Sequence, residues 1–225
     1  MRKATVMQLQ THFHIILDRS GSMASIADDI VGGFNTFLAD QKALPGAATL
    51  SLIQFDSEDP FEVIHHNLPI AEVPLLTDKT FRPRGSTPLL DCIGRGINQL
   101  AGELSDRPEE SRPAGLVFVI VTDGAENAST EFRRDQISKL IETKTKTDNW
   151  KFVFLSADLS AMTEAHDLGM SKGSSLLFEN SGRGSRMAFQ ALSARSADFR
   201  AGDRSDLDFD DSERHRSDDP SRKKH

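Results

Sequence analysis

The sequence is short of cysteine and of long apolar runs, and it carries no excess of positive charge. Cys92 is the single cysteine among 225 residues, which excludes an intramolecular disulfide and favours a reducing compartment. No segment of the sequence approaches the roughly 20 consecutive apolar residues of a membrane span. The formal net charge of -7 argues against a general nucleic-acid binder, because such proteins present a basic face.

We expect no export signal at the start of this sequence. Arg2 and Lys3 are basic like the beginning of a signal peptide, but Gln8 and Gln10 interrupt the segment that follows. We therefore expect a cytoplasmic protein without membrane association. Hydrophobic residues make up 37% of the chain and charged residues 27%, which is typical of one soluble globular domain of good size.

Apolar periodicity predicts strands and helices that alternate along most of the chain. The predicted strands cover residues 11–17, 49–55, 62–68, 116–121, 152–156 and 175–179. The predicted helices cover residues 24–44, 88–104, 131–144, 160–168 and 186–200. A short polar cluster separates the second and third strands, so the third is predicted to be an antiparallel edge. This order predicts an α/β fold, a doubly wound Rossmann-like three-layer sandwich whose six-stranded sheet is otherwise parallel.

The composition changes near residue 202, and we predict one domain over residues 1–201 followed by a disordered tail over 202–225. The tail mixes acidic and basic residues, with Leu207 and Phe209 as its large apolar side chains. Such a segment buries too little surface to offset the entropy of ordering it. Leu207 and Phe209 are therefore interpreted as solvated, with a short docking motif as the alternative.

Adjacent glycines, Gly32 and Gly33, lie inside the first predicted helix. Each costs roughly 1 kcal/mol of helix propensity relative to alanine, so a compensating reason is expected. Close packing of this helix against the sheet is one such reason.

Oxygen-bearing side chains gather where the first predicted strand ends. Asp18, Ser20 and Ser22 alternate on a tight turn directly after the apolar run 15–17. Carboxylate and hydroxyl oxygens suit Mg²⁺, Mn²⁺ or Ca²⁺ rather than zinc or copper. Ligands of open α/β sheets bind at the carboxyl ends of the strands, so the position of this turn indicates a cation site.

Two later segments supply further oxygen donors, Thr87 and Asp123. Proline is favoured at the first helical position, so a helix is predicted to begin at Pro88 with Thr87 as its N-cap candidate. Thr87 is thus open to two interpretations, capping the helix or coordinating a cation, and the turn at Asp18 favours the second. Asp123 follows the most apolar strand, and it reaches the same spot as Asp18 if their two strands are neighbours.

Taken together, Asp18, Ser20, Ser22, Thr87 and Asp123 resemble the metal-ion-dependent adhesion site of von Willebrand factor type A domains. All five positions of that family's pattern are matched, and the resemblance covers roughly residues 10–200. It implies a bound Mg²⁺, or else Mn²⁺ or Ca²⁺, with direct coordination by the three hydroxyls and aspartates that often act through water. The resemblance is closest to stand-alone bacterial members of cytoplasmic type, which implies an accessory component of an intracellular multi-protein system.

The resemblance implies recognition rather than catalysis. In that family the Asp or Glu of a partner protein completes the coordination of the cation, so we expect a protein-binding module that is not an enzyme and has no catalytic residues. The alternative is a metal-assisted phosphohydrolase that uses the same cation. It requires a general base, for which Asp56, Asp91 and Glu126 are the candidates; Glu126 and Asn127 are otherwise expected to rim the site.

Other short motifs carry less weight. The segment 169–173 matches the Gly-x-Ser-x-Gly elbow of hydrolases, but it follows a predicted helix instead of a strand and is interpreted as a chance match. An EF-hand would require glycine at Met23 and usually glutamate at Asp29.

Two histidines and one aspartate have two interpretations each. His12 and His14 share one face of the first strand, and packing is favoured over a metal site because no third soft ligand is evident. Asp56 is interpreted as a plain turn carboxylate, with a supporting role beside the metal as the alternative.

Overall fold

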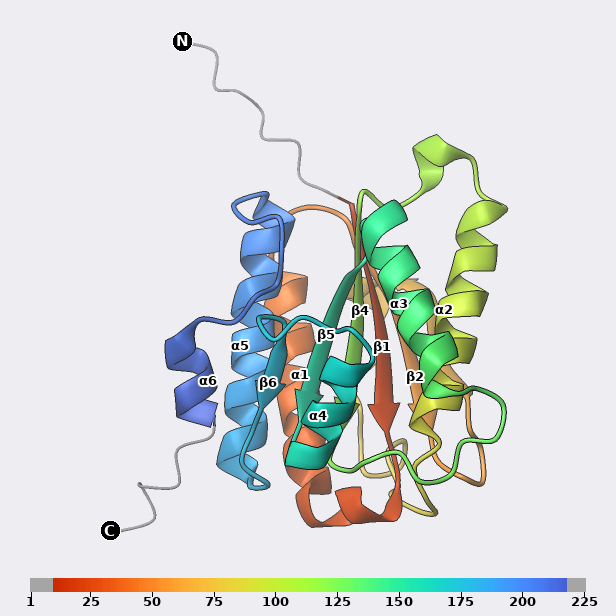
Figure 1. The fold of residues 1–225 in the computed structure, drawn as a ribbon. Helices are drawn as coiled ribbons and strands as arrows, with labels where there is room; N and C mark the ends of the chain where they lie inside the picture. Colours follow the sequence, from red (N-terminus) through yellow and green to blue (C-terminus); the bar gives the residue numbers. More distant parts are fainter. Residues whose placement is uncertain (1–9, 218–225) are drawn as a thin grey trace.

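The structure, a computed structural model, describes residues 10–217 and contains one six-stranded sheet in the order β3-β2-β1-β4-β5-β6 (Figure 1). Its strands are β1 (Thr11–Asp18), β2 (Ala48–Phe55), β3 (Glu62–Pro69), β4 (Gly115–Thr122), β5 (Lys151–Ser156) and β6 (Ser175–Leu177). Only β3 runs antiparallel to its neighbour, because a short polar turn joins it directly to β2. The predicted mostly parallel sheet with one antiparallel edge is confirmed.

Helices cover both faces of the sheet, which makes three layers. One face carries α1 (Ala27–Ala43) and α5 (Gly182–Ala201), and the other carries α2 (Leu89–Ser105), α3 (Arg134–Thr147) and α4 (Leu159–Asp167). Shorter elements are η1 (Gly21–Ile26), η2 (Ile70–Glu72), η3 (Glu109–Ser111) and α6 (Asp211–Ser217). Within the part of the chain that is described, no helix has both the length and the apolar character that crossing a bilayer demands.

The central strands β1 and β4 lie side by side, and all eight residues of each are buried. Leu17 is paired with Val121 in parallel register, so both strands end at the same edge of the sheet. This pairing is the condition on which the predicted convergence of Asp18 and Asp123 depended, and the structure meets it.

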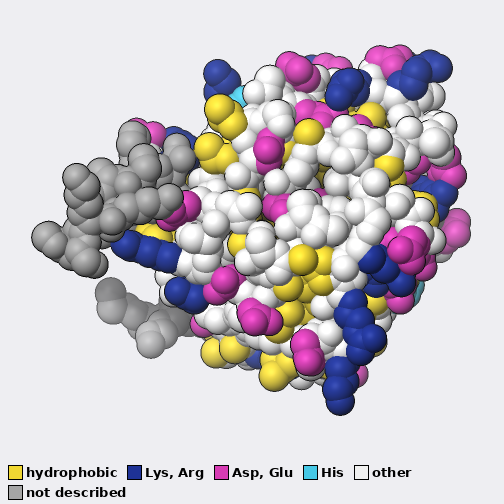
Figure 2. All heavy atoms as spheres, turned by 90° about the horizontal axis from the view of Figure 1, so that it is seen from below, with side chains coloured by type: hydrophobic (Ala, Val, Ile, Leu, Met, Phe, Trp, Pro, Cys, Tyr) yellow, Lys and Arg dark blue, Asp and Glu magenta, His cyan; other side chains and the backbone are white. Residues whose placement is uncertain are grey.

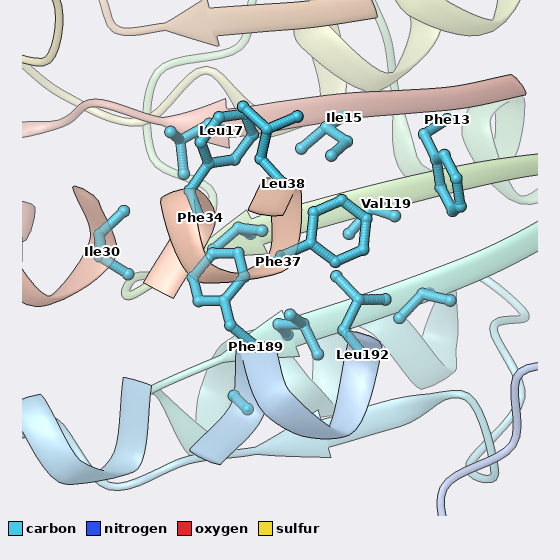
Figure 3. Packing of buried hydrophobic residues seen from close by; sticks show 14 of the residues in the cluster. Phe13, Ile15, Leu17, Ile30, Phe34, Phe37, Leu38, Val119, Phe189 and Leu192 are labelled. Atoms are coloured by element: carbon cyan, nitrogen blue, oxygen red, sulfur yellow. The ribbon is translucent and has the colours of Figure 1, made fainter. Parts of the chain in front are cut away.

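Aromatic side chains fill the layer between the sheet and the helices α1 and α5 (Figure 3). Phe13 on β1 meets Phe37 on α1 edge to face, with ring centroids 5.4 Å apart. Phe34 and Phe189 extend the same cluster from the two helices. Full burial of each such side chain is worth about 1.5–3 kcal/mol, so this layer anchors both helices to the sheet.

Gly33 allows α1 and α5 to approach each other closely. A β-carbon at this position would lie 2.3 Å from Cδ2 of Phe189, which is too close for any side chain. The reason expected for this glycine was packing against the sheet; the structure shows packing against the neighbouring helix instead. A β-carbon at Gly32 would have no atom within 4 Å apart from its chain neighbours and the backbone of its own helix, so the cost of this glycine in helix propensity has no structural explanation.

The segment after α5 departs from the expected disordered tail. Leu207 and Phe209 are 1% and 2% exposed and belong to the core cluster under α5. The amide of Phe209 donates to the carbonyl of Gly173 at 2.8 Å, and α6 then packs beside α5 and β6. The interpretation of both apolar residues as solvated is wrong, because they reach a core whose position the local sequence does not reveal. Residues 218–225 of the predicted tail lie outside the described residues.

Candidate metal site

The first part of the site is the turn that follows β1. The amide of Ser20 donates to Oδ1 of Asp18 at 2.7 Å, which folds the turn back over the end of the strand. The hydroxyl oxygens of Ser20 and Ser22 lie 3.1 Å apart. Asp18 and Ser20 are buried, whereas Ser22 is exposed. The turn therefore presents the buried carboxylate of Asp18 and the buried hydroxyl of Ser20, with only Ser22 exposed.

The second part comes from the end of β4. Ser22 donates its hydroxyl hydrogen to Oδ1 of Asp123 at 2.7 Å. Thr122 donates to Oδ2 of Asp18 at 2.5 Å, which joins the two strand ends. The structure thus brings together Asp18, Ser20, Ser22 and Asp123, as the sequence predicted.

Thr87 reaches the same place from the loop before α2. Its amide donates to Oδ1 of Asn127 at 2.8 Å, and the amide of Asn127 donates to its carbonyl at 3.1 Å. A β-carbon built at Gly124 would lie 3.7 Å from the hydroxyl oxygen of Ser22 and 3.9 Å from that of Thr87. Both hydroxyls therefore border the backbone that follows Asp123.

The structure corrects the capping interpretation of Thr87. Helix α2 begins at Leu89, so Pro88 and not Thr87 takes the N-cap position, and it makes no side-chain capping hydrogen bond. Glu126 accepts from the amide of Leu90 at 2.9 Å, and Ser129 accepts from the next amide at 3.1 Å. Because a distant loop satisfies these first amides, the hydroxyl of Thr87 is left without a hydrogen bond to any residue of 10–217.

The donor set suits a small hard cation. All five side chains offer oxygen, and octahedral coordination at the Mg²⁺–oxygen distance puts neighbouring ligand atoms about 2.9 Å apart. The separations of 3.1 Å between Ser20 and Ser22 and 2.7 Å between Ser22 and Asp123 match this spacing. Within residues 10–217 there is no group of three or more His, Cys, Asp or Glu side chains arranged for a metal ion. A metal ion bound here would therefore need hydroxyl ligands in addition to the two carboxylates.

The two carboxylates lack a positive partner. Burial raises the pKa of Asp18 to about 7, although hydrogen bonds from Thr122 and Ser20 act in the opposite direction. Burial also raises the pKa of Asp123. No salt bridge formed between residues 10 and 217 reaches either group. A bound cation would supply the missing charge and favour the ionised carboxylates.

His12 and His14 lie away from this site and serve packing. His12 is hydrogen-bonded through Nδ1 to the hydroxyl of Thr49 at 2.7 Å. His14 stacks on Phe118 with ring centroids 4.9 Å apart. The packing interpretation of both histidines agrees with these contacts.

Sequence reasoning missed two supporting roles. Asn127 was expected at the rim of the site, but it forms two hydrogen bonds with the backbone of Thr87. Arg19, inside the first turn, is 6% exposed and forms a buried ion pair with Asp56. No local pattern marks either contact, because the partners are 40 and 37 residues apart.

Comparisons with known proteins place the fold. In sequence, neither a model of a known protein family nor a curated protein matches the chain. In structure it is similar to a von Willebrand factor type A protein from Catenulispora acidiphila, with a TM-score of 0.56 and 15% identity over 84% of this chain and 43% of that one. The pilus adhesin SpaC from Lactobacillus rhamnosus GG in its open conformation gives 0.60 and 12%, over 87% of this chain and 30% of the adhesin.

A third relative was solved with a metal. The manganese-loaded TRAP protein of Plasmodium vivax has a TM-score of 0.52 and 11% identity, over 76% of this chain and 69% of that one. The present chain spans less than half of the Catenulispora and Lactobacillus structures. The order of the strands, the two helical layers and these relatives together show that the chain has the von Willebrand factor type A fold.

Proposed function

We propose that the chain is a metal-dependent protein-binding module. In this proposal Asp18, Ser20, Ser22, Thr87 and Asp123 hold a divalent cation, Mg²⁺ first of all, with Mn²⁺ and Ca²⁺ as alternatives. When bound, such a cation offers an open, electrophilic position that the Asp or Glu carboxylate of a partner protein fills. The observation that carries the proposal is the convergence of these oxygen-bearing side chains, drawn from three loops, on one edge of the sheet.

The arrangement of the donors supports recognition from outside. Asp18 is buried below the site and Ser22 is exposed above it, so an incoming carboxylate approaches from the hydroxyl side. Only two of the five donors carry charge, so a divalent cation keeps affinity for another anion. Figure 2 views the face at the carboxyl ends of the strands, where Lys and Arg side chains lie mostly toward the margins and scattered Asp and Glu side chains lie among uncharged surface farther in.

Structural relatives add indirect support. One was solved loaded with manganese and another is an adhesin, properties that belong to those proteins and agree with the proposal. We further propose a bacterial, cytoplasmic setting in which the chain is an accessory part of a multi-protein system. The net charge of -7 favours a protein partner over nucleic acid.

A metal-assisted phosphohydrolase is the competing proposal, and the candidate bases argue against it. Asp91 accepts hydrogen bonds from three backbone amides, those of Thr130, Glu131 and Phe132. Glu126 caps α2, and Asp56 is fully buried between two arginines. Each carboxylate is thus engaged in holding a loop, which leaves none of the three poised to activate water.

The proposal is tested by titrating the metal-free protein with Mg²⁺ and Mn²⁺ in a calorimeter. We expect one cation to bind per chain in the wild type and none in Asp18→Ala. Asp106→Asn is the matched control, because this aspartate is exposed at the end of α2. Equal binding by Asp18→Ala and the wild type would sink the proposed site.

The partner is then sought by capture from the source cell with and without EDTA, using the wild type, Asp18→Ala and Asp106→Asn. We expect a protein that is retained only by the wild type and the control, and only while metal is present. Hydrolysis of a generic phosphoester by the metal-loaded protein, abolished by Asp18→Ala, would favour the enzymatic alternative instead.

A further inference from the structure

Asp56 lies directly after β2 and is fully buried. One of its oxygens, Oδ1, accepts from the amides of Glu58 at 2.7 Å and Asp59 at 3.0 Å, as an ordinary turn carboxylate does. Its other oxygen, Oδ2, faces away from the turn and meets two arginines. Burial raises the pKa of Asp56, but these hydrogen bonds outweigh burial and hold the pKa below its usual value.

The two arginines come from the two loops that carry the metal-site hydroxyls. Arg19 lies between Asp18 and Ser20, and its Nε and Nη2 atoms lie 2.8 Å and 2.7 Å from Oδ2 of Asp56. Arg84 precedes Thr87 by three residues, and its Nε donates to the same oxygen at 3.0 Å. One carboxylate oxygen therefore joins both loops to the end of β2.

Backbone hydrogen bonds run alongside this junction. The amide of Arg84 donates to the carbonyl of Arg19 at 2.8 Å, and the amide of Gly21 donates to the carbonyl of Gly85 at 3.0 Å. Gly85 has a φ of +65°, and a β-carbon there would lie 2.6 Å from the hydroxyl oxygen of Ser57. The two loops thus touch along their backbones, and the position of one determines the position of the other.

Neutral contacts alone do not account for the burial of Arg19, which is 6% exposed. Its Nη1 atom also contacts Gln54 at 3.2 Å and pairs with Glu62. A buried guanidinium is tolerated only when it is paired and hydrogen-bonded, and Asp56 is the fully buried one of its two acidic partners.

We propose that Asp56 is a positioning residue for the metal site, acting through Arg19 and Arg84 to set the distance between Thr87 and the two serines. This inference rests on the proposed function, since it concerns the same cation. Mg²⁺ and Mn²⁺ bind well only when their ligands stand close to octahedral positions, and a loop that drifts loses its ligand. Groups behind the ligands of a metal typically change its affinity by about 10–100-fold when they are removed.

The experiment uses Arg84→Met in the full chain, with Mn²⁺ alone as the probe and free Mn²⁺ measured by electron paramagnetic resonance. The Arg84 side chain is 42% exposed, so its loss leaves the fold and the pair between Arg19 and Asp56 intact. We expect Mn²⁺ to bind about tenfold more weakly. Arg84→Lys should recover part of the affinity, because an ammonium reaches the same oxygen with a single donor. Arg82→Met is the matched control in the same exposed loop, and its affinity should equal that of the wild type.

A second measurement needs no metal. Hydrogen exchange of the metal-free protein over residues 84–90 should be faster in Arg84→Met than in the wild type and Arg82→Met, because the loop has lost its tie to Asp56. Asp56→Asn should weaken Mn²⁺ binding further. Should that variant fail to fold, Arg84→Met decides the question.

The outcomes separate this inference from the proposed function. If wild type and Asp123→Ala bind Mn²⁺ equally, or neither binds it, the proposed metal site fails. If the wild type binds and Asp123→Ala does not, an Arg84→Met affinity within twofold of the wild type overturns the positioning role alone. A tenfold loss in Arg84→Met with an unchanged Arg82→Met supports it.

Discussion

Strand β1 carries two kinds of buried titratable side chain, and they are treated in opposite ways. At its carboxyl end, Asp18 has both oxygens hydrogen-bonded, to the amide of Ser20 and the hydroxyl of Thr122. In its middle, His14 is 3% exposed, and neither of its ring nitrogens has a hydrogen-bond partner among residues 10–217. Asp18 is surrounded by polar partners, whereas His14 is packed in an apolar layer without a hydrogen bond.

The difference shows what burial of a polar group means at each place. Burying an ionised group is costly unless charge and hydrogen bonds compensate. Residues near Asp18 supply hydrogen bonds, but within residues 10–217 no salt bridge supplies the opposite charge. His14 has no such support, so it stays neutral and packs as a flat ring against Phe118. A buried titratable residue therefore indicates function here only where other polar groups converge on it.

The largest expected effect tests the polar end of the strand through Asp18→Asn. The new side chain can accept from the amide of Ser20 and donate to Thr122, whose hydroxyl already lies 3.0 Å from the carbonyl of Gly124. The fold should survive while the charge is lost. Mg²⁺ at 100 times its Kd stabilises the wild type by about 2.7 kcal/mol, or about 5–10 °C in Tm, and the variant should lose this rise. Thermal unfolding with Mg²⁺ and with EDTA measures this rise in Tm. If Asp18→Asn showed the same rise as the wild type, Asp18 would not be part of a cation site.

A smaller effect is expected from acid at the apolar site. Burial lowers the pKa of His14 well below 6.5, and burial together with Arg107 lowers that of His12 to about 4. The unfolded chain binds protons at both residues below pH 6.5 while the folded chain does not. Stability is therefore complete above pH 6.5 and falls as the pH decreases, by about 1.4 kcal/mol per unit for each histidine.

His14→Leu separates this contribution from the rest of the acid response. The variant removes unpartnered nitrogens and keeps an apolar side chain, so at pH 7 its stability should equal or exceed that of the wild type. Between pH 7 and pH 5, protonation of His14 in the unfolded state should cost the wild type about 2 kcal/mol of unfolding free energy, and the variant should not show this loss. Urea unfolding at both pH values measures it. Parallel pH curves for the two proteins would show that His14 is protonated in the folded state.

The smallest expected effect comes from Thr49→Val, which removes the hydrogen-bond partner of His12 on the neighbouring strand. We expect a loss of about 1 kcal/mol of unfolding free energy, typical of one hydrogen bond. The Mg²⁺-dependent rise in Tm should be unchanged, because this contact lies at the other end of the sheet from Asp18. A reduced rise would mean that the two regions are coupled.

Much of the fold followed from local pattern. The predicted strands 11–17 and 116–121 are buried strands, and the polar turn before β3 made that strand an antiparallel edge. The five oxygen donors were identified from residue types and spacing. Hydrogen bonds bring Asp18, Ser20, Ser22 and Asp123 together, and the Thr87 hydroxyl borders the same backbone at Gly124. Their role as ligands stays a prediction for the titrations to test.

Other features depended on contacts between distant residues. Helix α2 is capped by Glu126 from another loop, and Gly33 makes room for Phe189 on α5. Leu207 and Phe209 sit among charged residues in sequence, yet they lie in the core. Each of these contacts joins residues that are far apart in the sequence, and local periodicity predicts no contact between such residues.

The sequence by itself determined which side chains offer oxygen, which segments alternate as strand and helix, and which turn follows each strand. Those properties depend on residue type and on spacing over a few positions. The tertiary structure alone decided that β1 and β4 are neighbours, that Asp56 joins Arg19 to Arg84, and that Leu207 and Phe209 lie in the core. These outcomes depend on the burial of apolar surface and of charge across the whole domain, and no short stretch of residues contains that information.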